Sequence, residues 1–302
     1  MCGIVGLFLK NQELEGTLGH RLEPMLLEMT ERGPDSAGIA IYRNGAAPGE
    51  TKFTLFNADP GFDWSGLEFA MRCELQAEVR YRLNGNHAVF TLSADPERTI
   101  EWLRDERPEV RLVSVGHRIE LYKDVGTPAE VADSFALDAM DGSHGIGHTR
   151  MATESGVTTA HSHPFWAGLD LCLVHNGTIS NYHGLRDWLK RRGLHFESDN
   201  DSEVAAKYLA YRIAEGATLK QALEAGLKDL DGFYTFCVGT GDGFAVMRDP
   251  FACKPAVIAE TDDWVAMASE FRSLAKLPGI DAATVWEPRP ETVYAWHREG
   301  RA

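Results

Sequence analysis

A cysteine stands directly behind the initiator methionine, and its position suggests chemistry. Removal of Met1 would leave Cys2 with a thiol nucleophile and a free α-amine on the same residue. The amine has a reference pKa of about 8, so it can accept a proton near neutral pH. The alternative interpretation is an ordinary first strand that carries an idle cysteine.

Other segments carry the remaining groups that a thiol needs to cleave a carboxamide. Asn176 and Gly177 follow an apolar strand and are expected to form an Asn-Gly turn, where an amide side chain and a backbone N–H can meet one oxygen. Arg150 can hold a carboxylate through a bidentate contact, and Asp201 can hold an ammonium group. Glutamine carries a carboxylate, an ammonium group and a carboxamide, so these residues are consistent with glutamine hydrolysis.

Five separated segments resemble the motifs of class II glutamine amidotransferases, which belong to the N-terminal nucleophile hydrolase superfamily. In chain order they are residues 2–6, 32–38, 147–150, 175–177 and 201–203. Each segment alone is a weak signal, but five in family order, starting directly behind Met1, are specific. The resemblance implies an α+β fold, namely a four-layer αββα sandwich with the nucleophile at the end of the first strand.

The same resemblance implies a role for each matching residue. Cys2 would be the nucleophile, and Asn176 with Gly177 would form the oxyanion hole. Arg150 with Thr153 would hold the glutamine carboxylate, and Asp201 would hold its amine. Arg32 with Asp35 would shape the pocket. At Glu154 the chain departs from the amino-sugar-forming relatives, which have a histidine at this position. A carboxylate cannot simply replace that histidine.

Hydrophobic periodicity predicts the elements that must position these residues. Apolar residues at helical spacing predict helices at 20–31 and 68–82, and a further helix that Asp201 is expected to cap. The expected strands include residues 4–8, 39–42, 87–92, 233–238 and 244–247. We expect a single domain over residues 1–302, with a small inserted α+β subdomain at about 46–140 that carries no chemical motif.

Charge and composition restrict the class of protein. The chain has 302 residues and a formal net charge of −15, which argues against binding nucleic acid or anionic membrane surfaces. The sequence contains neither a long apolar run typical of a membrane span nor a secretory signal. Its five scattered cysteines fit reduced thiols, so we expect a cytoplasmic protein.

The resemblance also implies a partner. The residues after Glu270 are too few for a synthase domain, so we expect this chain to be a glutaminase subunit that passes ammonia to a separate synthase subunit. The sequence around 149–165 looks most like stand-alone subunits of glutamate synthase-like or N-methylglutamate synthase complexes, which are hetero-oligomers. We expect no cofactor and no metal in this chain, whereas the partner subunits could carry FMN and an iron–sulfur cluster.

Two alternatives remain open at the level of sequence. Five histidines lie close together in the chain, and such a cluster could bind a divalent metal in a metal-dependent amide hydrolase. They are His144, His148, His161, His163 and His175. The second alternative is a non-catalytic regulatory subunit that keeps the fold, but the presence of nucleophile, oxyanion donors and substrate anchors together disfavours it.

Overall fold

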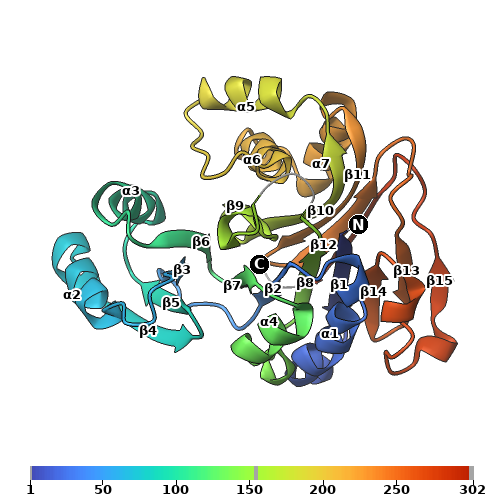
Figure 1. Cartoon of the computed structure of the whole chain (residues 1–302), viewed down its shortest axis with the longest axis horizontal. Helices are drawn as coiled ribbons and strands as arrows, with labels where there is room; N and C mark the ends of the chain where they lie inside the picture. Colours follow the sequence, from blue (N-terminus) through green and yellow to red (C-terminus); the bar gives the residue numbers. More distant parts are fainter. Residues whose placement is uncertain (1, 153–155, 299–302) are drawn as a thin grey trace.

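The computed structural model of the protein describes residues 2–152 and 156–298, which form three antiparallel sheets (Figure 1). The seven-stranded sheet contains, in spatial order, β15 (Thr284–Trp286), β13 (Val257–Glu260), β14 (Trp264–Ala268), β1 (Gly3–Leu9), β8 (His144–Arg150), β2 (Ser36–Tyr42) and β7 (Ile119–Val125). The five-stranded sheet contains β16 (Val293–His297), β12 (Gly243–Arg248), β11 (Gly232–Thr240), β10 (Leu171–Ile179) and β9 (Phe165–Gly168).

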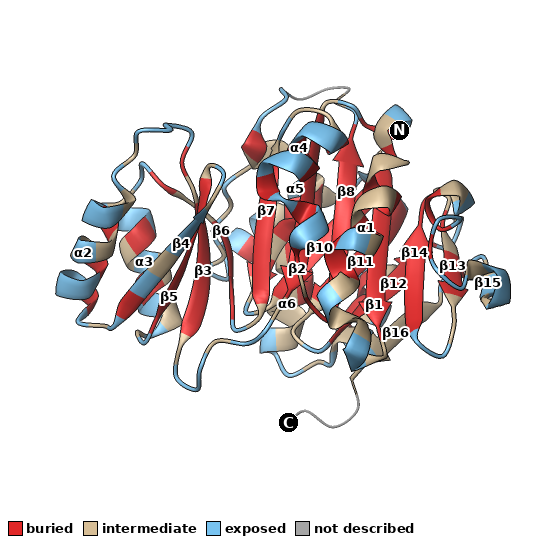
Figure 2. Ribbon diagram, turned by 90° about the horizontal axis from the view of Figure 1, so that it is seen from below, coloured by how far each residue is buried: buried red, intermediate tan, exposed pale blue. Residues whose placement is uncertain are grey.

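These two sheets pack face to face, and helices cover their outer faces. Side chains alternate across a strand, so Val5, Leu7 and Leu9 of β1 pack beneath the helices while Ile4 and Phe8 face the other sheet. The helices on the seven-stranded sheet are α1 (Leu18–Leu27) and α4 (Pro128–Phe135). Those on the five-stranded sheet are α5 (Tyr182–Lys190), α6 (Asp201–Ala214) and α7 (Leu219–Asp229). The predicted αββα sandwich is therefore confirmed, and Figure 2 shows its strands mostly buried.

The third sheet forms a subdomain with its own apolar core beside the sandwich (Figure 1). Its elements are β3 (Thr51–Phe56), α2 (Trp64–Leu75), β4 (Val79–Asn84), β5 (His87–Leu92), α3 (Pro96–Glu106) and β6 (Arg111–Gly116). The sequence-based boundary at 140 is too late, because β7 pairs with β2 of the main sheet and α4 packs on the outer core. We call the segment Thr51–Gly116 the inserted subdomain.

A predicted helix in this region also differs from the structure. The pattern predicted one helix at 68–82, but α2 ends at Leu75 and Gln76 adopts a left-handed conformation with φ of 55°. Residues Val79–Asn84 then form β4, which pairs with β5. The pairing with β5 decides the conformation of this stretch, and local periodicity cannot reveal it.

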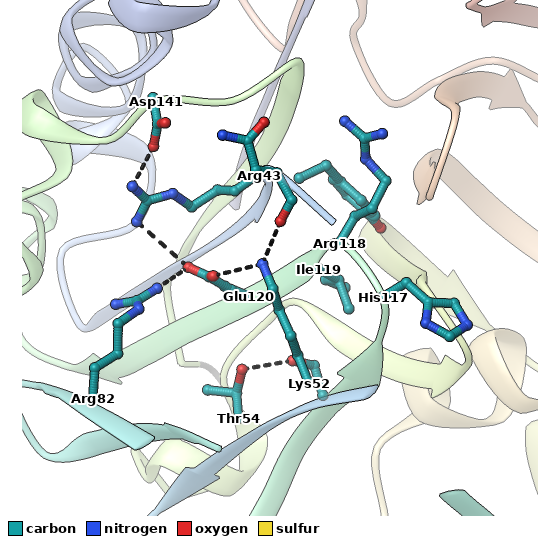
Figure 3. A network of polar contacts seen from close by, with 12 residues as sticks. Arg43, Lys52, Thr54, Arg82, His117, Arg118, Ile119, Glu120 and Asp141 are labelled. Carbon is teal, nitrogen blue, oxygen red and sulfur yellow. Dashed lines mark hydrogen bonds and ion pairs between the residues drawn. The ribbon is translucent and has the colours of Figure 1, made fainter. Parts of the chain in front are cut away.

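A buried carboxylate joins the inserted subdomain to the main sheet (Figure 3). Glu120 of β7 lies 3.0 Å from the Lys52 ammonium of β3 and also pairs with Arg82 of β4. Arg43, which follows β2, lies 3.6 Å from the same carboxylate and pairs with Asp141. Burial opposes ionisation of Glu120, but the three surrounding cations outweigh it and keep the pKa of Glu120 below its ordinary value.

Short 3₁₀ helices complete the described elements. They are η1 (Gln12–Thr17), η2 (Thr30–Arg32), η3 (Leu137–Ala139), η4 (Thr159–His161), η5 (Phe271–Ser273) and η6 (Ile280–Ala282). In the described part of the chain, no helix has the length and apolar character needed to cross a bilayer.

Candidate active site

Two side chains from distant segments hold the backbone of Cys2. Arg32, at the end of η2, donates from Nε to the Cys2 carbonyl oxygen at 3.0 Å. Asn176 of β10 donates from Nδ2 to the same oxygen at 3.1 Å. Three of the residues that the sequence singled out therefore meet at one carbonyl group, at the point where β1 begins.

The residues that follow Cys2 are also held in place, by hydrogen bonds and close packing. Ile4 donates its N–H to Ser269 Oγ at 2.9 Å, and its carbonyl accepts from the Ser269 N–H at 2.9 Å. A Cβ atom on Gly3 would lie 2.7 Å from Met29 Cβ and 2.8 Å from Thr149 Oγ1, so only glycine fits there. Chain ends usually fray, but here β1 is packed and hydrogen-bonded from its first residue.

Arg150 and Asp35 lie at the same end of the seven-stranded sheet as Cys2. Gly3 pairs with Thr149 and Ser36 pairs with Arg150, so the residues next to these pairs lie at one edge. Asp35 accepts the Ala152 N–H at 2.8 Å and donates its own N–H to the Arg150 carbonyl at 3.1 Å. Asp35 thus shapes the chain that leaves β8.

The Arg150 side chain is buried and contacts the same loop. Its Nη1 donates to the Gly156 carbonyl oxygen at 3.3 Å. The guanidinium therefore lies between the end of β8 and the segment that returns toward β9. Thr153 and Glu154, which the sequence analysis also considered, lie outside the described residues.

The predicted Asn-Gly turn at 176–177 is wrong. β10 continues to Ile179, and Asn176 pairs with Thr235 while Gly177 pairs with Tyr234 of β11. Gly177 has a φ of 145°, and a Cβ atom there would lie 1.9 Å from the Phe233 carbonyl oxygen. The glycine permits a strand conformation that other residues rarely adopt.

Asp201 does not cap α6 as predicted, because it is the first residue of that helix. The cap is Asn200, whose side chain accepts the Ser202 N–H at 2.8 Å. Asp201 instead accepts the Ile179 N–H on Oδ2 at 2.9 Å. Its carboxylate therefore lies against the strand that carries Asn176 and Gly177.

The structure adds one residue that sequence reasoning missed. Glu270 lies 2.6 Å from Arg32 Nη1, and this hydrogen bond lowers the pKa of Glu270. It follows β14, which pairs with β1. Its only sequence signal is a charged residue after an apolar run, and its place near Cys2 depends on that long-range pairing.

Three buried histidines form a polar layer behind Asn176. The Ser202 hydroxyl lies 2.9 Å from His163 Nε2 and 2.8 Å from His175 Nδ1. His148 Nε2 donates to the His175 carbonyl at 3.0 Å, and its ring stacks on His163. Burial lowers the pKa of all three, to about 3 for His148, so they are neutral near pH 7.

The other two histidines of the proposed metal cluster lie elsewhere. His144 Nε2 donates to the Thr240 carbonyl at 2.8 Å, and His161 lies 2.8 Å from Asp199. Across residues 2–152 and 156–298, no group of three histidine, cysteine or acidic side chains is arranged to hold a metal ion. The described residues therefore give the metal-dependent alternative no ligand set.

Comparisons with known proteins show the family of this chain. A family model described as a glutamine amidotransferase domain matches residues 148–276. The glutamine amidotransferase-like protein GlxB of Rhizobium meliloti (strain 1021) is 52% identical over 303 residues, covering 100% of both chains. The chain belongs to the class II glutamine amidotransferases. A second relative of this amidotransferase, from Methanothermobacter thermautotrophicus, is 34% identical over 97% of this chain and 98% of its own length.

A solved structure supports the amidotransferase fold. The glutamine phosphoribosylpyrophosphate amidotransferase from B. subtilis superposes with a TM-score of 0.61 at 19% identity. The match covers 98% of this amidotransferase and 49% of the solved chain, so the present chain spans about half of that protein's length. At this identity the likeness shows the fold alone.

Proposed function

We propose that this chain is a glutaminase subunit that hydrolyses glutamine to glutamate and ammonia through a Cys2 thioester. The observation that carries the proposal is the convergence of Arg32 and Asn176 on the Cys2 carbonyl, at 3.0 and 3.1 Å. This anchoring fixes a thiol-bearing chain end beside an amide donor. A covalent mechanism requires a nucleophile and an oxyanion donor at one place.

In the proposed reaction, the Cys2 thiolate attacks the side-chain carbonyl of glutamine and a C–S bond forms. Asn176 and Gly177 donate hydrogen bonds to the oxyanion, the C–N bond breaks, and the nitrogen takes a proton to leave as ammonia. Water then attacks the thioester, which gives glutamate and returns the thiol. The free α-amine of Cys2 transfers the protons, so Met1 must be absent from active protein, and mass spectrometry checks this.

The substrate would be oriented by charges of both signs. Arg150 and Thr153 would hold the α-carboxylate of glutamine, and Asp201 would hold its α-amine. Asp35 supports this assignment because it fixes the backbone that follows Arg150 through the Ala152 N–H. Arg32 and Asp35 would act by shaping the pocket.

Removal of the thiol tests the catalytic assignment. Cys2→Ala should abolish glutamate release from glutamine while leaving the circular dichroism spectrum unchanged, because the side chain is not part of the core. Cys253→Ala is the matched control, since Cys253 is also a free cysteine but is exposed. It should retain full activity and full labelling of Cys2 by a diazoketone analogue of glutamine. Activity retained by Cys2→Ala would overturn the assignment.

The ammonia would pass to a synthase on another chain. A glutamate synthase-like or N-methylglutamate synthase complex fits the sequence of the segment around 149–165, and its partner subunits would carry FMN and an iron–sulfur cluster. Affinity purification of the tagged chain from its native cells should recover a flavin-containing partner. Recovery of this chain alone, with glutaminase activity intact, would argue for an independent glutaminase.

A further inference from the structure

A pocket of about 710 Å³ lies between the inserted subdomain and the helical layer over the five-stranded sheet. Phe56 and Leu112 line it from the inserted subdomain, and Trp166 and Phe196 line it from the other side. Its volume is within the range of roughly 300–1,000 Å³ that is usual for small-molecule sites. We call it the subdomain pocket, and it is not lined by any described residue that was assigned above to glutamine hydrolysis.

Three charged side chains in the subdomain pocket have no polar partner among residues 2–152 and 156–298. Arg111 of β6, Glu197 before α6 and Lys207 of α6 all line it. Within the described residues, none of these three side chains has a hydrogen bond or an ion pair, although the Lys207 ammonium lies 4.5 Å from the centre of the Trp166 ring. The Trp166 indole Nε1 is also buried, and no described residue forms a hydrogen bond with it.

The Glu203 carboxylate already accepts hydrogen bonds from other groups. Glu203 accepts the N–H groups of Glu197 and Ser198 at 2.9 and 2.8 Å, and the Ser198 hydroxyl at 2.7 Å. It influences Lys207 through its charge but forms no ion pair with it. The polar groups that face the pocket are therefore available to bind a ligand.

Leaving charges desolvated and unpaired is costly. Burial raises the pKa of Glu197 and lowers the pKa of Lys207, which shows that both groups lose solvation. An anionic ligand would recover this cost at Lys207, which Glu197 offsets only through its charge, whereas a packing contact between subdomains would be better served by apolar residues.

We propose that the subdomain pocket binds a small amphiphilic anion, with a carboxylate or phosphate head on Arg111 and Lys207 and an apolar body against Phe56, Leu112 and Phe196. The chain as a whole has a net charge of −15. Among the charged residues that line the pocket, in contrast, Arg104, Arg111 and Lys207 outnumber Glu109 and Glu197. The site therefore offers locally positive charge beside apolar surface.

Fluorescence titration of the full chain with 1-anilinonaphthalene-8-sulfonate tests the proposal, because this probe is itself an aromatic anion. Binding should saturate at one molecule per chain. Octanoate or octyl phosphate should displace the probe, and octanol should not. Displacement by octanoate alone assigns a carboxylate head, and displacement by octyl phosphate alone assigns a phosphate head. Displacement by neither anion would overturn the proposal.

Variants locate the binding. Arg111→Gln with Lys207→Gln should weaken probe binding about tenfold or more, since the charge-assisted hydrogen bonds to the anionic head are lost. The matched control is Lys220→Gln with Lys228→Gln, two exposed lysines of α7, which should bind as the unaltered chain does.

Ala58→Trp provides a second, independent variant. Ala58 is exposed and lines the pocket, so a large side chain there should block entry without disturbing a core. If the double glutamine variant does not fold, judged by circular dichroism, Ala58→Trp decides the question. Undiminished probe binding by either folded variant would place the anion elsewhere and overturn the proposal.

Discussion

Gly177 has a backbone conformation that an L-residue side chain does not fit. Its φ is 145°, and an added Cβ would lie 1.9 Å from the Phe233 carbonyl oxygen. Gly177→Ala should therefore cost about 1–3 kcal/mol of unfolding free energy and displace the backbone beside Asn176, which should reduce glutamine hydrolysis. Urea unfolding and a glutaminase assay measure the two effects.

A second glycine serves as the control with the opposite sign. Gly184 lies within α5, and apart from its neighbours and its own helix backbone no atom of the described residues lies within 4 Å of an added Cβ. Gly184→Ala should stabilise the protein by about 0.5–1 kcal/mol and leave activity unchanged. Equal stabilities for the two alanine variants would show that Gly177 is not strained against β11.

The sequence identified the residues of the site more successfully than it predicted their contacts. Cys2, Arg32 and Asn176 could be singled out from their types and chain order, and the structure brings them together. The contact of Glu270 with Arg32 could not be predicted, because it depends on β14 pairing with β1 across more than 250 residues of sequence. Local residue patterns carry no record of such a pairing.

At the scale of elements, the Glu120 network is a polar joint between the inserted subdomain and the main sheet (Figure 3). Glu120→Ala would leave Lys52 and Arg82 without their shared carboxylate. Loss of one partner from a buried pair costs about 3–5 kcal/mol, so we expect a decrease of that size in urea unfolding and earlier proteolysis of the inserted subdomain.

An exposed ion pair provides the control for that prediction. Glu224 lies 3.9 Å from Lys220 on the surface of α7. Glu224→Ala should change stability by less than about 1 kcal/mol, because exposed pairs are screened by solvent. If Glu120→Ala were no more destabilising than Glu224→Ala, the network would not hold the two parts together.

Elements with a complete local signal were predicted well. The strand expected at 87–92 is β5, and the expected helix near the N-terminus is found as α1 followed by η2. The errors fall where distant pairing overrides local pattern: the turn at 176–177 is a continuous strand beside β11, and the end of the 68–82 helix is a strand beside β5. The late boundary of the insertion has the same cause, since β7 pairs with β2.

For the whole molecule, the fold buries histidines that are neutral in the folded state. Burial lowers the pKa values of five of them from the ordinary value of 6.5, to about 3 for three. They are His87, His144, His148, His163 and His175. Below pH 6.5 the unfolded chain binds protons that the folded chain does not, so stability should fall as the pH decreases from 6.5 toward 3.

The decrease in stability with decreasing pH should be steep, and single histidines should account for parts of it. Each additional proton on the unfolded chain contributes about 1.4 kcal/mol per pH unit, and unfolding at about pH 7.5 and about pH 5.5 isolates histidines from carboxylates. His87→Phe should reduce the dependence, since His87 already lies among the rings of Phe56, Tyr122 and Phe135. The control variant His183→Gln, at an exposed residue, should leave the pH dependence of stability unchanged. Equal stability at the two pH values would contradict the prediction. It would mean that the folded histidines take up protons as readily as the unfolded ones, in spite of their burial.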